Sequence, residues 1–174
     1  RTAKVFLLCN PQNPVGRLWT REELERLGDI CLKYGVKVIS DEIQCDITPP
    51  GTSYTPFASI KPEFQQNCVC LNSPTKCFNI AGLHVSTIVA ANPEIRSEVK
   101  RIMVEWVHTD RNQIGVAALQ GAFSPEGEEW LEQMNDYVHQ NYLYLRSRFT
   151  EELPQLHVCQ LEATYLVWVD CSAL

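Results

Sequence analysis

The sequence lacks the features that mark membrane and nucleic-acid-binding proteins. No apolar run approaches the roughly 20 residues that a membrane-spanning helix needs, and residues 1–8 do not have the pattern of a signal peptide. No cluster of lysine and arginine is present, and 15 basic residues against 21 acidic ones give a net charge of -6. A nucleic-acid-binding surface would need a basic face. We therefore expect a cytoplasmic protein whose partners are small molecules, with no nucleic acid and no membrane among them.

A glycine-rich turn directly after a strand is also missing, which disfavours a doubly wound nucleotide-binding domain. The eight cysteines are scattered through strand-like and helix-like segments, so we expect buried free thiols and no disulfide framework. Cys68 and Cys70 would share one face of a strand, which allows two interpretations: half of a metal site, or core packing. Because no second pair stands at ligand spacing, we expect core packing and no metal.

The first forty residues alternate between strand and helix patterns. Residues 4–9 form a short apolar run, typical of a strand that is buried on both faces. Thr20 and Glu23 form a capping box, and apolar residues then recur at helical spacing as far as Gly35. Residues 36–40 predict a second strand. This order predicts a parallel pair with a right-handed crossover, and hence an α/β protein with a mostly parallel sheet.

The remainder of the chain contains further strand and helix patterns. Two strands are expected at 68–71 and 84–91, and their short connection allows the second to run antiparallel. The proline-containing stretch 48–62 is expected to be irregular, with a short helix near Ala58. Further predicted elements are helices at 93–107, 112–123 and 126–149, and strands at 158–160 and 164–169.

A soft domain boundary is expected near Ser124 and Pro125, where the parallel-sheet pattern gives way to a long helix and new strands. The predicted units are residues 1–124, part of a large domain, and residues 125–174, a linking helix and the start of a small α+β domain. The chain begins directly with a strand of the buried type and stops just after another strand, so we expect a fragment of a larger protein. Asp110 and Arg111 are expected to form an ion pair at a helix start.

Polar residues follow three of the predicted strands. Asn13 comes after the first strand, Asp41 ends the second, and Ser73 with Lys76 follows the strand at 68–71. Ligands of open α/β sheets bind at the carboxyl ends of strands, so these side chains are expected to converge on one point. Two of these residues, considered individually, have a plain structural alternative. Asp41 could be a turn or cap residue, and Lys76 could be an ordinary solvated lysine. The arrangement of the residues favours a cofactor site.

Four motifs carry a resemblance to a known family. They are Asn10-Pro11-Gln12-Asn13-Pro14-Val15-Gly16, Ser40-Asp41-Glu42-Ile43, the run from Ser73 to Leu83 (Ser-Pro-Thr-Lys-Cys-Phe-Asn-Ile-Ala-Gly-Leu), and the run from Glu162 to Asp170 (Glu-Ala-Thr-Tyr-Leu-Val-Trp-Val-Asp). In this order the motifs resemble the class I and II aminotransferases, pyridoxal-phosphate enzymes of fold type I, and within them the branch of cystathionine beta-lyase, MalY and PatB. The resemblance covers essentially the whole chain and implies a three-layer sandwich, here incomplete.

The resemblance assigns a role to each residue of the convergent set. Lys76 would hold pyridoxal 5'-phosphate as an imine and, once displaced, take the alpha proton of the substrate. Asp41 would lie against the pyridine nitrogen and keep it protonated, so that the ring accepts electrons. Asn13 would donate to the phenolate oxygen of the ring, and Ser73 would bind the phosphate.

Two positions depart from the family pattern. Gln44 stands where the wider family has tyrosine and the lyase branch has histidine as a second partner of the phenolate oxygen, and its amide can still donate. His84 stands where many relatives place an arginine on the phosphate; a structural role at the start of a strand is the alternative. Both are retained as candidate cofactor-binding residues.

The branch resemblance implies a carbon-sulfur beta-lyase of amino-acid metabolism, which would be a homodimer in its complete form. An aminotransferase is the first alternative, because it shares every residue named above. The second is a non-catalytic regulator that binds the cofactor, or an inactive fragment, with Gln44 as the motivating departure. The family's phosphate turn and substrate arginine are not among these residues, so we expect the chain alone to bind the cofactor poorly.

Overall fold

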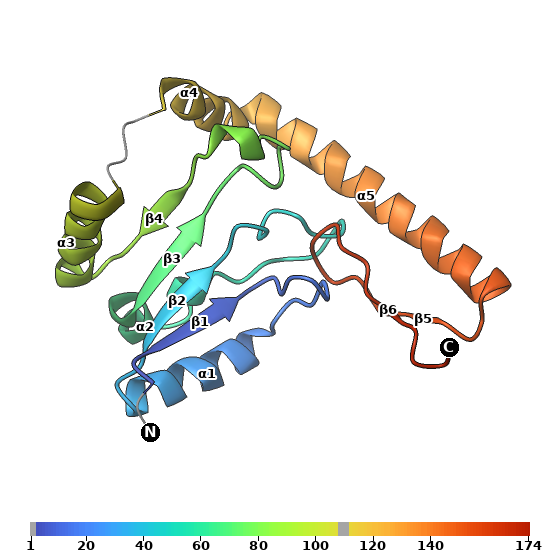
Figure 1. The fold of residues 1–174 in the computed structure, drawn as a ribbon, viewed down its shortest axis with the longest axis horizontal. Coiled ribbons are helices and arrows are strands. Elements are labelled where there is room, and N and C mark those ends of the chain that lie inside the picture. Colours follow the sequence, from blue (N-terminus) through green and yellow to red (C-terminus); the bar gives the residue numbers. More distant parts are fainter. Residues whose placement is uncertain (1–2, 108–111) are drawn as a thin grey trace.

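The computed structural model describes residues 3–107 and 112–174, so the predicted ion pair of Asp110 with Arg111 lies outside the described residues. Its main sheet has the order β1-β2-β3-β4 (Figure 1). The first three strands are parallel and the fourth is antiparallel, as the short connection allowed. The strands are β1 (Val5–Cys9), β2 (Lys37–Asp41), β3 (Cys68–Asn72) and β4 (Thr87–Val89). The prediction of an α/β protein with a mostly parallel sheet is confirmed.

The crossover helix α1 (Arg21–Lys33) begins where the capping box predicts. The Thr20 hydroxyl accepts from the backbone N–H of Glu23, and the Glu23 carboxylate accepts from the backbone N–H of Thr20. Two of the orphan donors of the first turn are thereby satisfied. A positive φ of 62° at Gly35 then lets the chain turn from α1 into β2.

One face of the sheet is covered by α1 and by α2 (Pro62–Asn67). The parallel register brings inward-pointing residues of neighbouring strands level, for example Val38 of β2 with Cys68 of β3. The core on this face consists of Leu8, Leu24, Cys31, Val38, Phe57, Ile60, Phe64, Cys68 and Cys70. Cys68 and Cys70 are thus core residues, with sulfur atoms 3.9 Å apart. Among the described residues no cluster of three or more potential metal ligands occurs.

The opposite face of β1 contradicts the prediction of burial on both sides. Val5 is 53% exposed and Leu7 is 67% exposed. Their apolar side chains alternate with the inward-pointing Leu8, and no described helix packs over them. A continuous apolar run indicates a strand that can be buried on both faces, but it cannot specify which segment provides the second cover.

The stretch between β2 and α2 is irregular, as expected, with the short 3-10 helix η1 (Phe57–Ser59) near Ala58. After β3 come η2 (Ala81–Leu83), β4, α3 (Pro93–Ile102) and the π-helical turn η3 (Met103–Val107). The helices α4 (Gln113–Ala122) and α5 (Pro125–Glu152) agree with the predicted ranges. No described helix is long and apolar enough to cross a membrane.

The C-terminal strands are shorter than predicted. Only β5 (His157–Val158) and β6 (Val169–Asp170) pair, antiparallel to each other. Residues 164–168 do not form the predicted strand, because Thr164 has a φ of 68° and its N–H bonds to the carbonyl oxygen of Ile47. Residues 162–164 bond to the loops that follow β1 and β2, and the chain then returns to β5, where the Trp168 carbonyl oxygen accepts from the Cys159 N–H at 2.9 Å (Figure 1).

The cysteines differ in exposure, and this predicts their reactivity. Cys171 is exposed, whereas Cys31, Cys45 and Cys77 are buried. Burial raises the pKa of Cys77 to about 12, with Asp46 adding to the effect, and burial raises the pKa of Cys31. Because the thiolate is the reactive form, a disulfide reagent at neutral pH is expected to label Cys171 within minutes while these buried thiols require unfolding. Mass spectrometry of the labelled protein measures this; early labelling of Cys77 would contradict it.

Candidate active site

The carboxyl ends of three parallel strands lie side by side. In register, Asp41 at the end of β2 stands between Cys9 of β1 and Leu71 of β3. The backbone continues this alignment beyond the strands: the Asn10 N–H donates to the carbonyl oxygen of Asp41 at 3.1 Å. On the other side, the N–H of the residue after Asp41 donates to the Leu71 carbonyl oxygen at 2.9 Å. The loops carrying the predicted site residues therefore leave the sheet at the same edge.

The loop after β1 presents Asn13 at an exposed position. Gln12 and Arg17 close the loop as an isolated antiparallel bridge, and Gly16 N–H donates to the Gln12 carbonyl oxygen at 2.9 Å. The peptide bonds before Pro11 and Pro14 are cis. The Asn13 N–H donates to Cys9 Sγ at 3.5 Å, and no hydrogen bond to its side-chain amide occurs among the described residues. The amide is therefore available to a ligand.

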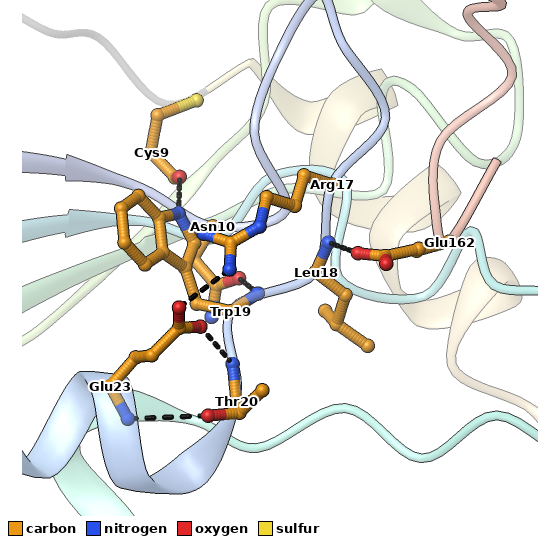
Figure 2. A network of polar contacts seen from close by, with 8 residues as sticks. All are labelled: Cys9, Asn10, Arg17, Leu18, Trp19, Thr20, Glu23 and Glu162. Carbon is orange, nitrogen blue, oxygen red and sulfur yellow. Dashed lines mark hydrogen bonds and ion pairs between the residues drawn. The ribbon is translucent and has the colours of Figure 1, made fainter. Parts of the chain in front are cut away.

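The base of this loop is fixed by polar contacts around the buried Asn10 (Figure 2). Asn10 is fully buried, and its Oδ1 accepts from the Trp19 N–H at 3.2 Å. The Trp19 indole Nε1 donates to the Cys9 carbonyl oxygen at 3.2 Å. The Tyr54 hydroxyl donates to the Asn10 carbonyl oxygen at 3.1 Å, and burial raises the pKa of Tyr54, which keeps this donor protonated.

The start of α1 is tied to the same loop. Arg17 pairs with Glu23 at 2.6 Å, and its guanidinium lies 4.7 Å from the centre of the Trp19 ring (Figure 2). The hydrogen bond from Arg17 holds the pKa of Glu23 below its ordinary value. Because both side chains are well exposed, the pair contributes orientation more than stability.

The two carboxylates after β2 point to different places. Asp41 is half-buried, and its Oδ1 accepts from the backbone N–H of Ile43 at 3.2 Å. Glu42 is buried and accepts from the Ser40 hydroxyl at 2.7 Å and from the Phe57 N–H at 3.2 Å. Because the Glu42 carboxylate is buried and already hydrogen-bonded within the protein, Asp41 is the carboxylate of this pair that a ligand can reach.

Gln44 is buried, and its Oε1 has no hydrogen-bond partner among the described residues. A buried amide without a partner is costly in a finished fold. Its position three residues after Asp41 places this unpaired amide at the edge of the sheet where the loops leave. The unpaired atom is an acceptor, so a hydrogen-bond donor would satisfy it, whereas any hydrogen bond from Gln44 to a ligand oxygen would have to come from Nε2.

The loop after β3 carries Ser73 and Lys76. Ser73 is buried; its hydroxyl donates to the Val85 carbonyl oxygen at 2.6 Å and lies 2.7 Å from the Thr75 hydroxyl. To donate to a phosphate, the Ser73 hydroxyl would have to give up its hydrogen bond to the Val85 carbonyl oxygen. Lys76 is half-buried and forms no hydrogen bond or ion pair within the described residues, so its amine is available for reaction.

The residue after Lys76 is held in the interior. Cys77 is 2% exposed, and its Sγ lies 3.6 Å from the Pro74 carbonyl oxygen and 4.0 Å from Asp46 Oδ2. The other oxygen of Asp46 lies 3.5 Å from Cys45 Sγ. One carboxylate thus bridges the residue after Gln44 and the residue after Lys76. Their buried side chains limit how these two loops can move relative to each other.

His84 ends η2 with a φ of 48°, in the left-handed region, and its side chain is exposed. Its imidazole forms no hydrogen bond or ion pair with the other candidate residues in the described parts of the chain. Of the six predicted residues, His84 and Asn13 are the most exposed, whereas Gln44 and Ser73 are buried.

Comparison with known proteins identifies the family. The family model "Aminotransferase class I and II" matches residues 1–174. The chain belongs to this family. It is 38% identical over 169 residues to cystathionine beta-lyase PatB of Bacillus subtilis, covering 97% of this chain and 43% of that protein. The chain thus spans less than half the length of this relative.

Two solved structures are also similar. The chain superposes on a C-S lyase of Staphylococcus hominis bound to pyridoxal phosphate with a TM-score of 0.90 and 40% identity, over 97% of this chain and 42% of the other. Cystalysin of Treponema denticola, which contains pyridoxal 5'-phosphate, gives a TM-score of 0.92 and 32% identity, over 96% and 42%. The resemblance noted from the motifs is confirmed, as is the expected fold type I architecture, of which this chain spans a part.

The residues of the site fit pyridoxal phosphate. A carboxylate, a primary amine without a partner among the described residues, and the side-chain amides of Asn13 and Gln44, whose nitrogen atoms can donate, leave one sheet edge, and these are the chemical groups that a charged ring bearing an aldehyde and a phenolate requires. A cavity of about 580 Å³ lies elsewhere, between α5 and the segments near Thr20, Thr52 and Glu162.

Sequence reasoning missed several residues that build this edge. Tyr54, in the stretch treated as irregular, contacts Asn10, and Glu162, quoted only as part of a motif, contacts the loop of Asn13. Asp46 had no assigned role. The one available signal was compositional: an acidic or aromatic residue within an otherwise apolar or proline-rich segment needs a polar partner.

Proposed function

We propose that the complete protein containing this chain is a pyridoxal-phosphate-dependent enzyme that cleaves the carbon-sulfur bond of a sulfur-containing amino acid. The observation that supports this most is the common sheet edge from which Asn13, Asp41 and the Lys76 loop leave, together with membership of the family. The names of the PatB relative and of the Staphylococcus hominis structure favour lyase chemistry.

Each residue would act on the cofactor or the substrate in a defined way. Lys76 would hold the cofactor covalently, and its freed amine would take the alpha proton of the substrate. Asp41 would keep a proton on the ring nitrogen, because an anion nearby favours the charged form. Asn13 and Gln44 would donate to the ring oxygen. His84 would bind the phosphate, and so would Ser73 once its hydroxyl no longer donates to the Val85 carbonyl oxygen. When bound, the cofactor supplies an electron sink.

In the lyase reaction, a cysteine S-conjugate and one water give a thiol, pyruvate and ammonia. The carbon-sulfur bond breaks with its electron pair on sulfur, which takes a proton as the thiol leaves. An aminotransferase would use the same groups but return the proton to a different carbon and pass the amino group to a keto acid. The family includes aminotransferases by name, so this is the second candidate.

Incubation of the complete protein with L-cystathionine is expected to release a thiol and pyruvate without any added keto acid. Thiol titration and a coupled pyruvate assay measure the products. Heat-treated protein with free cofactor is the control. If amino-acid consumption depends on a keto acid and no thiol appears, the protein is an aminotransferase. A cofactor-bound protein without activity on any amino acid would support the non-catalytic regulator.

We further propose that residues 1–124 and 125–174 belong to a large and a small domain, that the complete enzyme is a cytoplasmic homodimer, and that its substrate is an amino acid. The start of α5 at Pro125, with Ser124 as its N-cap, supports the division. Sedimentation of the complete protein tests the dimer.

A further inference from the structure

The segment of residues 161–164, which we call the strap, lies against the loop that carries Asn13. The N–H groups of Glu162 and Ala163 both donate to the Gly16 carbonyl oxygen, at 2.9 and 3.0 Å. The contact has no spare room: a Cβ on Gly16 would lie 2.7 Å from Leu161 Cδ1 and 3.0 Å from the Ala163 carbonyl oxygen. The loop and the strap are therefore fitted to each other.

The side chain of Glu162 adds a second connection. Its Oε2 accepts from the Leu18 N–H at 2.9 Å, which joins residues 144 positions apart in the sequence (Figure 2). The nearby guanidinium of Arg17 pairs with Glu23 instead. The half-buried Glu162 carboxylate thus binds the backbone of the loop base, immediately after the bridge from Gln12 to Arg17 that closes the loop.

The strap also reaches the loop after β2. The Thr164 N–H donates to the Ile47 carbonyl oxygen at 2.8 Å, three residues beyond Gln44. Thr164 is 2% exposed and adopts a φ of 68°, which a β-branched residue adopts only when its surroundings impose it. The strap therefore contacts both the loop after β1 and the loop after β2, and its backbone is strained at Thr164.

We infer that Glu162 is a positioning residue for Asn13: through Leu18 and Gly16 it holds the loop of the candidate site in the orientation that the cofactor requires. This inference rests on the proposed function. The Glu162 side chain bonds to the Leu18 backbone and to none of the six candidate residues. It would therefore act on the cofactor only through the loop that carries Asn13.

The experiment compares three variants of the complete protein. Glu162→Ala removes the acceptor of the Leu18 N–H, Glu162→Gln keeps a neutral acceptor, and Glu151→Ala removes an exposed carboxylate of α5 that has no partner among the described residues. Two measurements are made on each: amide hydrogen exchange of the peptide 10–18, and the dissociation constant of added pyridoxal phosphate after removal of bound cofactor.

Glu162→Ala is expected to speed exchange in peptide 10–18 and to weaken pyridoxal phosphate binding about tenfold, because a part-buried N–H loses a charged acceptor. Glu162→Gln is expected to stay within about threefold of wild type, since a neutral acceptor retains about half of the bond. Glu151→Ala should be unchanged. Exchange in peptide 21–33, which covers α1, reports whether each variant is folded.

Two results would overturn the inference while leaving the proposed function intact. One is wild-type exchange in peptide 10–18 of a folded Glu162→Ala protein. The other is faster exchange with unchanged affinity for pyridoxal phosphate, which would mean that Glu162 holds the loop without serving the cofactor. Failure of the wild-type protein to bind pyridoxal phosphate would instead overturn the proposed function, and the role of the strap in cofactor binding with it.

Discussion

Replacement of Lys76 by alanine is expected to lower turnover by the complete protein by a factor of about 10⁴ or more. A positioned general base alone contributes about 10² to 10⁴ in rate, and here the same amine also anchors the cofactor. The half-buried Lys76 has no protein partner among the described residues, so its loss removes chemistry without leaving a broken ion pair. Thermal stability, compared between the cofactor-free forms of both proteins, should therefore stay near that of wild type. The visible absorbance band of the covalently bound cofactor should disappear, which a spectrum measures directly.

Two controls separate attachment from charge. Lys76→Arg keeps the positive charge but has no primary amine, and it should lose the band as Lys76→Ala does. Lys100→Ala removes an exposed lysine of α3 and should keep both band and turnover. A Lys76→Ala protein that retained the band would show that another residue holds the cofactor. The proposal that Lys76 binds the cofactor while Asp41 lies at its ring nitrogen would then be wrong.

The elements that sequence predicts well are those whose cause is local. The start of α1 follows from Thr20 and Glu23, which contact each other three residues apart, and the structure has both halves of that capping box. The parallel pair of β1 and β2 follows from the length of the crossover. In both cases the residues that decide the structure are neighbours in the chain, so the pattern contains the information.

The elements that sequence mispredicts depend on distant partners. Val5 and Leu7 have the composition of a two-sided buried strand, yet burial depends on what covers them. The run from Thr164 has a strand composition, but the Thr164 N–H bonds to Ile47, which lies 117 positions earlier (164 minus 47). β-propensity describes how a side chain fits a half-buried sheet, and it does not select between a neighbouring strand and a loop.

The candidate site shows the same division. The strand-end rule predicts that Asn13, Asp41 and Lys76 belong to one sheet edge, because parallel strands end on the same side. The rule does not predict that the Ser73 proton is donated to Val85, or that Glu162 accepts from Leu18. Those contacts arise from loop conformations, which a single sequence leaves open.

The sheet edge depends on the core beneath it, and Phe64 has the largest predicted effect on stability. Phe64 of α2 is 1% exposed and stacks on Phe57 with ring centres 5.2 Å apart. Phe64→Ala should lower the free energy of unfolding by about 3 to 5 kcal/mol, the usual cost of removing a buried aromatic ring. Since typical domains are stable by about 5 to 15 kcal/mol, this is a large share. Urea denaturation of the complete protein measures it.

Gly28 of α1 provides a second test of the same contact. A Cβ at Gly28 would lie 2.4 Å from Phe64 Cζ, so Gly28→Ala forces the ring to shift and should cost about 1 to 3 kcal/mol despite the better helix propensity of alanine. Gly121→Ala in α4, where nothing lies within 4 Å of the added Cβ, is the matched control and should be neutral or stabilising. In the double variant the space left by Phe64 accepts the new methyl group, so its destabilisation should be smaller than the sum of the two single effects by about 1 to 3 kcal/mol. Strictly additive effects would mean that the Phe64 ring does not lie against Gly28, and the packing of α1 on α2 that supports β1 and β2 would need to be revised.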